Sequence, residues 1–174
     1  MIRKIVYCDK AYKKIRLNIS PGAKFNTILS TINRIDYPGT PVKSEHINYA
    51  ILELINNSLR AHRERDEKDP VTVEFSVKPP NLHVDIIDRG GGFNPGKLPF
   101  SLSADPDTVD IHNEEFNVYR KQNDYKRFGM GFYIVKKTFQ TFELSFYDGS
   151  GNPVPWEHGN VIGTRINLSL GELS

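Results

Sequence analysis

The sequence predicts an α+β fold, a two-layer sandwich in which about three helices cover one face of a mixed sheet. Runs of alternating apolar and polar residues, typical of strands, occur at the beginning, in the middle and at the end of the chain. Apolar residues at helical spacing lie between these runs. No linker rich in proline, glycine or serine divides the chain, so residues 1–174 are expected to form a single domain.

Two strands and a helix are expected in the N-terminal part of the chain. The strands lie at 2–7 and 13–19, and the DKAY sequence between them favours a hairpin. Pro21 and Gly22 end the alternation. Residues 24–35 then carry apolar side chains at helical spacing. This pattern predicts a first helix, whose exposed apolar residues would suit a contact in a homodimer.

The clearest helix begins near Ser44, a suitable N-cap, and runs through EHINYAILELINNSLRAH with a single apolar stripe. Glu53 and Asn57 are four residues apart, so they lie one turn from each other on one face of this helix. Both carry hard oxygen atoms of the kind that Mg²⁺ accepts, and a glutamate can orient or deprotonate a hydroxyl. A surface glutamate beside a buried asparagine bonded to the backbone would give the same pattern.

Two alternating runs at 71–77 and 82–88 predict a hairpin around Pro79 and Pro80. The second run leads directly into DRGGGF, where an acidic residue at a strand end is followed by three glycines. Asp88 can accept a hydrogen bond from a ligand amino group, and the glycines let the backbone approach a ligand closely. A tight turn after a strand would explain these residues equally well.

A long connection follows this hairpin. Residues 94–128 show no sustained pattern except for a short helix expected at 112–122, and a connection of this length is usually functional or disordered. A further helix is expected from residue 129 onward, and two strands at 141–147 and 161–170 complete the chain.

Glycines precede this last helix in the sequence FGMGFYIVKK. A helix N-terminus exposes backbone N–H groups and carries partial positive charge, and Gly129 and Gly131 would let a phosphate approach it. Lys126 and Arg127 add charge directly ahead of the glycines, which favours anion binding. A simple capping turn is the alternative interpretation.

The amino-acid composition of the chain argues against several classes of function. With 23 Lys and Arg against 21 Asp and Glu, the formal charge of +2 gives no reason to expect direct contact with nucleic acid. Cys8 is the only cysteine, so neither an internal disulfide nor a thiolate metal cluster is expected. No apolar run is long enough for a membrane helix, and the N-terminus is too polar for a signal peptide. We therefore expect a cytoplasmic protein without membrane contact.

Four segments, taken together and in this order, resemble the conserved boxes of the GHKL (Bergerat-fold, histidine-kinase-like) ATPase superfamily. They are ELINNS, DRGGGF, GMGFYIVKK and GTRINL, and the resemblance spans roughly residues 45–170. The superfamily includes gyrase-type ATPases, the ninety-kilodalton heat-shock chaperones, histidine kinases and mismatch-repair ATPases. The resemblance implies ATP and Mg²⁺ as cofactors.

The resemblance implies roles at the phosphate end of the nucleotide. Asn57 would bind the Mg²⁺ that bridges the phosphates, and Glu53 would be the catalytic base or the acid that orients water. Gly129 and Gly131 would flank the phosphates, and residues 94–128 would form the mobile ATP lid. Many relatives carry another glycine shortly before this glycine pair, where this chain has other residues.

In the place of that glycine, Lys126 or Arg127 is expected to supply charge to the γ-phosphate. At the adenine end, the resemblance implies that Asp88 recognises the amino group of the base. Thr164 would support it directly or through water. Gly90 and Gly92 would let the chain pass close to the nucleotide.

The layout is most similar to that of the anti-sigma-factor serine/threonine kinases. In these proteins the ATP domain phosphorylates a serine of a small antagonist protein and sequesters a sigma factor, so a regulatory protein of either kind is the expected partner. A complete histidine kinase is not expected, because none of the histidines fits a phosphoacceptor upstream of the ATP domain. They are His46, His62, His83, His112 and His158.

Three alternatives remain open from the sequence. The chain could bind nucleotide and regulate a partner without transferring phosphate, or it could be a detached ATP domain of a histidine kinase. The glycines could also serve only turns in a plain α+β interaction domain. We therefore expect an ATP-dependent protein kinase or ATPase, with these alternatives to be separated by experiment.

Overall fold

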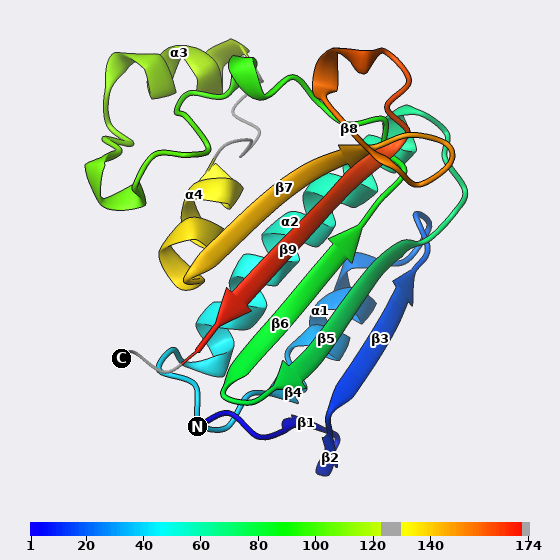
Figure 1. Ribbon diagram of the computed structural model, residues 1–174, viewed down its shortest axis with the longest axis vertical. Coiled ribbons are helices and arrows are strands. Elements are labelled where there is room, and N and C mark those ends of the chain that lie inside the picture. The colour runs from blue at the N-terminus through cyan, green and yellow to red at the C-terminus, as the bar shows by residue number, and fades with distance from the viewer. Residues whose placement is uncertain (123–129, 172–174) are drawn as a thin grey trace.

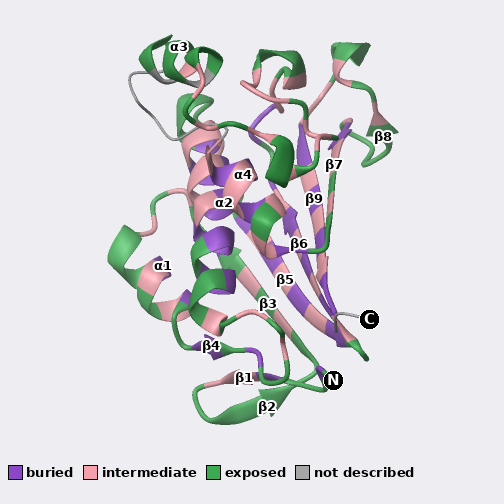
Figure 2. Cartoon of the chain, turned by 90° about the vertical axis from the view of Figure 1, so that its left-hand side faces the viewer, coloured by how far each residue is buried: buried purple, intermediate pink, exposed green. Residues whose placement is uncertain are grey.

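The structure, a computed structural model, describes residues 1–122 and 130–171. Its main layer is a six-stranded sheet, and helices α1 (Phe25–Ile32), α2 (Ser44–Glu64) and α4 (Met130–Thr138) lie behind one face of this sheet (Figure 1). The perpendicular view separates the helices from the sheet as two layers (Figure 2). The predicted α+β two-layer sandwich is therefore confirmed.

The strands of the large sheet follow the order β3-β5-β6-β9-β7-β8. In this order their bounds are Lys14–Ile19, Val71–Lys78, Asn81–Ile87, Gly163–Leu170, Thr141–Tyr147 and Pro153–Val154. Each pairing between these neighbours is antiparallel, whereas the sequence led us to expect a mixed sheet. The reason is that β6 and β7 run in the same direction but do not pair, because β9 lies between them.

A second sheet of three strands lies near the N-terminus, in the order β2-β1-β4. β1 (Ile5–Tyr7) pairs with β2 (Lys10–Tyr12) through a tight turn at Cys8 and Asp9, whose φ angles are 48° and 62°. β1 also pairs with β4 (Ile35–Asp36), a strand that the sequence did not predict. The expected hairpin between the first two predicted strands is therefore wrong: the chain reverses earlier, and β3 pairs with β5 instead.

The ends of two helices differ from the sequence prediction. α1 ends at Ile32, and Ile35 belongs to β4. Ser44 does not cap α2, because the N-cap position is Lys43, which makes no side-chain cap hydrogen bond. The Ser44 hydroxyl instead accepts a hydrogen bond of 3.0 Å from the backbone N–H of Tyr37, so it ties the preceding loop to the helix.

Helix α2 turns one apolar face toward the interior of the molecule. Its apolar stripe is buried as predicted, through Ile47, Ala50, Ile51, Leu54, Ile55 and Leu59. Val73 and Phe75 of β5 and Val84 and Ile86 of β6 are buried on alternate positions of their strands. Burial of each such side chain contributes about 1.5–3 kcal/mol. This core fixes α2 relative to β6.

The connection between β6 and α4 has short 3₁₀ turns at Pro95–Lys97 and Pro106–Thr108, followed by α3 (Glu114–Gln122). The helix expected at 112–122 is therefore confirmed. The connection lies at the same end of the molecule as the end of β6, above α4 in Figure 1. In the described part of the chain, no helix has the length and apolar character that a membrane span requires.

Candidate functional site

A cavity of about 730 Å³ opens between the C-terminal half of α2, the ends of β6 and β9, and the connection that carries α3. The predicted site residues that line it are Asn57, Asp88, Gly90, Gly92 and Thr164. Apolar side chains, among them Leu54, Phe132 and Ile166, complete the lining. Cavities of roughly 300–1,000 Å³ with a few converging polar groups are typical of small-molecule sites.

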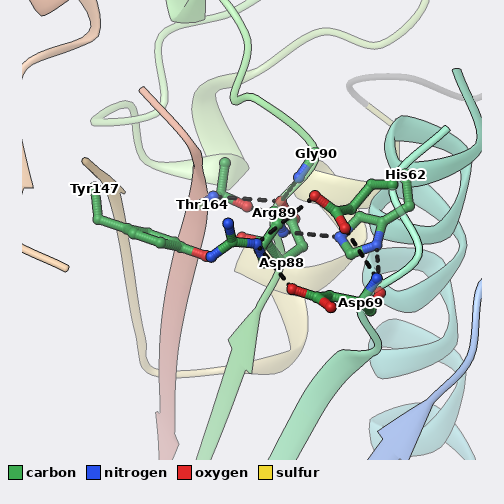
Figure 3. A network of polar contacts seen from close by, with 8 residues as sticks. His62, Asp69, Asp88, Arg89, Gly90, Tyr147 and Thr164 are labelled. Carbon is green, nitrogen blue, oxygen red and sulfur yellow. Dashed lines mark hydrogen bonds and ion pairs between the residues drawn. The ribbon is translucent and has the colours of Figure 1, made fainter. Parts of the chain in front are cut away.

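The carboxylate of Asp88 is buried and accepts four hydrogen bonds from the protein; Figure 3 shows Asp88 with two of the donor residues, Gly90 and Thr164. Oδ2 accepts from the hydroxyls of Ser58, at 2.7 Å, and Thr164, at 2.5 Å. Oδ1 accepts from the backbone N–H groups of Gly90, at 2.9 Å, and Thr164, at 3.3 Å. These donors come from α2, from the turn after β6 and from β9. A buried carboxylate held in this way has one defined orientation.

The backbone around Asp88 is held from the sheet as well. Its N–H donates to the carbonyl of Thr164, at 3.0 Å, and its carbonyl accepts from the hydroxyl of Tyr147 on β7. Burial raises the pKa of Tyr147, and the nearby Asp88 carboxylate raises it further, so the phenol keeps the proton that it donates. β7 and β9 are thus both tied to Asp88, the residue directly after β6.

The glycines after Asp88 are required by close packing. A Cβ on Gly90 would lie 2.5 Å from the Cβ of Ala61, so this glycine lets the turn touch α2. Gly92 has a φ of 71°, and its Cβ would lie about 3 Å from the side chains of Val161, Phe146 and Trp156. Gly90 and Gly92 therefore bring the cavity wall against its neighbours, and their contact with a nucleotide stays a prediction.

Glu53 and Asn57 meet the beginning of α4, as their shared helix face predicted. A Cβ on Gly131 would lie 3.3 Å from Asn57 Nδ2 and 3.6 Å from Glu53 Oε2. Asn57 Oδ1 accepts a hydrogen bond of 3.1 Å from the Arg60 guanidinium, whereas its buried Nδ2 has no hydrogen-bond partner among the described residues. Neither Glu53 nor Gly131 is among the described residues that line the cavity.

Three of the predicted site residues, Lys126, Arg127 and Gly129, lie outside the described residues. The part of the predicted lid that is described contacts α4 along its outer side. Lys136 donates to the carbonyls of Leu102 and Ala104, and burial lowers the pKa of Lys136. This segment is therefore attached to the same helix that begins beside Asn57.

An aromatic cluster joins both ends of the predicted lid to the sheet. The ring of Phe93, directly before the lid, stacks on Phe132 of α4 at 5.5 Å and meets Phe146 of β7 edge to face at 5.6 Å. Trp156 packs on the other side of Phe146, also at 5.5 Å. Such pairs contribute about 0.5–1.5 kcal/mol beyond burial. The loop at 149–160 is therefore packed against the cavity wall through its tryptophan.

The sequence interpretation missed three residues that contribute to the site: Ser58, Arg60 and Tyr147. Ser58 follows Asn57 directly, and the helical period would have placed it toward the sheet and hence toward Asp88. Arg60 lies three residues after Asn57, a spacing at which helical side chains meet. Tyr147 has no local signal, because its bond to Asp88 joins residues 59 positions apart.

These residues fit a nucleotide that brings its own metal ion. Within the described ranges, no group of three or more His, Cys, Asp or Glu could hold a metal ion. Magnesium is usually bound by one or two protein oxygens together with substrate phosphates, and Asn57 Oδ1 and the Glu53 carboxylate can supply those oxygens. The buried Nδ2 of Asn57 can donate to a phosphate oxygen, which would satisfy it.

Comparison with known proteins agrees with this geometry. Residues 24–155 match the family model described as histidine kinase-like ATPase domain, which covers well over half of the chain. A comparison with curated proteins gave no match. Residues Asn57 and Asp88, which line the cavity, fall inside the matched range. The chain therefore belongs to the family of histidine kinase-like ATPase domains and is an ATP-binding domain of the GHKL type.

Proposed function

We propose that the chain, as one domain, binds Mg·ATP in this cavity and transfers the γ-phosphoryl group to a serine or threonine of a regulatory protein, as anti-sigma-factor kinases do. The observation that carries the proposal is the buried Asp88 carboxylate, oriented by four donors in the wall of a cavity of suitable size. A partner such as a sigma factor or its antagonist would follow from this function.

At the base end, the amino group of adenine donates to Asp88. Both carboxylate oxygens already accept two hydrogen bonds, so the amino group must replace one donor. The hydroxyls of Ser58 and Thr164 can do this by rotation alone, whereas the two backbone donors cannot. A displaced hydroxyl then donates to a ring nitrogen of the base, directly or through water. In this arrangement the site contacts two neighbouring groups of adenine, the amino group and a ring nitrogen.

At the other end, the N-terminal turn of α4 and the amide of Asn57 receive the phosphates. Magnesium, held by Asn57, would neutralise phosphate charge. Lys126, Arg127 and Gly129 would add contacts there. Glu53 orients the acceptor hydroxyl and takes its proton as the oxygen bonds to phosphorus and ADP leaves.

A second candidate is a nucleotide-dependent binding module that does not transfer phosphate. It is favoured by the position of Glu53, which is not among the described cavity-lining residues. A detached histidine-kinase ATP domain would bind the same nucleotide and transfer phosphate to a histidine. The chemical stability of the phosphorylated product separates the serine/threonine kinase from the histidine-kinase domain, because phosphoserine survives acid and phosphohistidine does not.

Calorimetric titration of ADP and ATP with Mg²⁺ tests the proposal. The wild type should bind both nucleotides, and Asp88→Asn should lose about a hundredfold in affinity, because one base contact and its charge are removed. Asp85→Asn is the matched control, since Asp85 lies on the same strand and is bonded to Asn167 rather than exposed to the cavity. Equal affinity of Asp88→Asn and wild type would reject the adenine site.

Glu53→Gln then separates a kinase from a binding module. A kinase variant should retain nucleotide binding within about threefold but lose the phosphoprotein formed with labelled ATP and the partner. Unchanged phosphoprotein formation in Glu53→Gln would remove Glu53 from the mechanism. Absence of any phosphoprotein with the wild type, despite nucleotide binding, would favour the binding module.

A further inference from the structure

His62 is a fully buried histidine in the last turn of α2, and neither end of the proposed nucleotide site uses it. It lies four residues after Ser58 and therefore on the same face of the helix. Its Nε2 lies 2.8 Å from the backbone nitrogen of Arg89, and its Nδ1 lies 3.0 Å from the carbonyl oxygen of Asp69 (Figure 3). One ring thus joins α2, the loop that follows it, and the end of β6.

These two partners define the state of the ring. A backbone N–H can only donate a hydrogen bond, and a carbonyl oxygen can only accept one. Nε2 of His62 must therefore carry a lone pair and Nδ1 a proton, so the ring is neutral. A proton on Nε2 would place two donors face to face and break the bond to Arg89.

The bond to Arg89 is part of a continuous set around the carboxylate of Asp88. The four successive N–H groups of residues 88–91 each have an acceptor. Three of these acceptors lie on the turn itself or on the chain at the beginning of β9. The His62 ring is the only one of the four that lies on α2. Together with the bond from Ser58 to the Asp88 carboxylate, it sets the position of the turn relative to the helix.

Charged groups surround the ring on the loop and at the end of β6. The titratable groups of this network are those of Glu67, Asp69, Asp88, Arg89 and Tyr147. The Arg89 side chain pairs with Asp69, at 3.2 Å, and Glu67, at 3.6 Å. The pKa of Glu67 is lowered, chiefly by its hydrogen bond from the Asp69 N–H and further by the Lys68 N–H and Arg89.

We propose that His62 is a positioning residue for recognition of the base. Its Nε2 lone pair holds the Arg89 peptide, and through it the Asp88 carboxylate, in the geometry that binds the adenine amino group. The inference rests on the proposed function, because it assigns His62 a part in the same adenine site.

Two carboxamide variants separate the two bonds of the ring. The amide of His62→Gln reaches the position of Nε2 and can accept from Arg89, whereas the amide of His62→Asn reaches only Nδ1 and Asp69. His62→Gln should bind ADP within about threefold of wild type. His62→Asn should bind roughly tenfold more weakly, because the Arg89 N–H loses its acceptor. Equal losses in both variants would show that the ring only fills space and would overturn the proposal.

A measurement without nucleotide keeps this inference distinct from the proposed function. In ¹H–¹⁵N spectra of the free protein, the amides of Arg89 and Gly90 should shift in His62→Asn and stay near their wild-type positions in His62→Gln. If they do so while the wild type binds no ADP, the proposed function fails and the positioning of the turn by His62 stands. Unmoved amides in His62→Asn would overturn the positioning role itself.

Discussion

At the base end of the cavity, Asp88 accepts four hydrogen bonds, and its backbone is tied to both β7 and β9. At the other end, Asn57 keeps a buried amide nitrogen without a hydrogen-bond partner among the described residues, and its oxygen is held only by a side chain of the same helix. The first end is built from strands of the core. The second is built where α2 meets α4.

This difference indicates that the two ends of the cavity contribute to ligand binding in different ways. Under the proposed function, a carboxylate that is already oriented would lose little freedom when a base arrives, so the base end would provide affinity and selectivity from the start. A buried amide without a partner costs free energy until a ligand satisfies it, so the nucleotide would complete the phosphate end. Substitutions at the two ends should therefore affect adenosine and ATP differently.

Gly163→Ala should have the largest effect, at the base end. A Cβ there would lie 1.8 Å from the carbonyl oxygen of Asp88, so β9 must move away from the carboxylate. Calorimetry should show about a hundredfold loss for adenosine and ATP alike, with a lower melting temperature. Gly149→Ala is the control, because the new Cβ would lie 3.9 Å from the side chain of Ile162, an ordinary contact. Retained adenosine affinity in Gly163→Ala would contradict the rigid base end.

Thr164→Val should have a smaller effect at the same end. The change keeps the shape but removes the hydroxyl that donates to Asp88 and is able to rotate toward the base. We expect about a tenfold loss, equal for adenosine and ATP. Thr72→Val, on the sheet at a hydrogen bond to Asn18, is the matched control. A loss of affinity for ATP but not for adenosine would place Thr164 at the phosphates and would contradict the assignment of Thr164 to the base end.

Gly131→Ala tests the phosphate end. The new Cβ would lie 3.3 Å from Asn57 Nδ2, a tight contact that a small shift of α4 can relieve. ATP should bind about fivefold more weakly, while adenosine affinity should not change, because the base end is untouched. The ratio of the two affinities is the measurement. An equal loss for both ligands would show that the two ends are not independent.

Lys136→Met should have the smallest effect. It removes the ammonium group that holds the carbonyls of Leu102 and Ala104 but keeps the aliphatic chain. We expect about a threefold faster release of ATP in stopped-flow measurements and faster proteolysis near residue 103. Lys10→Met, on β2, is the control. An unchanged rate of both release and proteolysis would show that this attachment does not hold the lid.

Local patterns allowed much of the fold to be predicted from the sequence. The hairpin of β5 and β6 and the length of α2 follow from period-2 and period-3.6 spacing, which neighbouring residues alone determine. The position of β9 between β6 and β7, and the pairing of β1 with β4, depend on contacts far apart in the chain and were not predicted. The hydroxyl of Ser44 was assigned to the wrong partner for the same reason.

In the site, the order of the glycine and acidic boxes pointed to Asp88, Asn57 and Thr164. Thr164 was expected to support Asp88, and it does so. The other side chains that hold Asp88 or its turn were not predicted, because their bonds span long stretches of sequence. Ser58 is 30 positions from Asp88 and Tyr147 is 59 positions away, while His62 is 27 positions from Arg89. Sequence motifs thus identified three residues that line the cavity, and the structure added most of the side chains that orient Asp88.

The position of β9 in the sheet also determines when, during synthesis of the chain, the Asp88 carboxylate gains all of its donors. A chain grows from its N-terminus, so β3, β5, β6 and α2 emerge from the ribosome before Gly163 and Thr164 have been joined to it. Until then the edge of β6 is open, and the Asp88 carboxylate lacks two of its donors. Any product that ends before residue 163 keeps this defect. The Asp88 carboxylate therefore gains its full set of donors only in a chain that has been synthesised past Thr164.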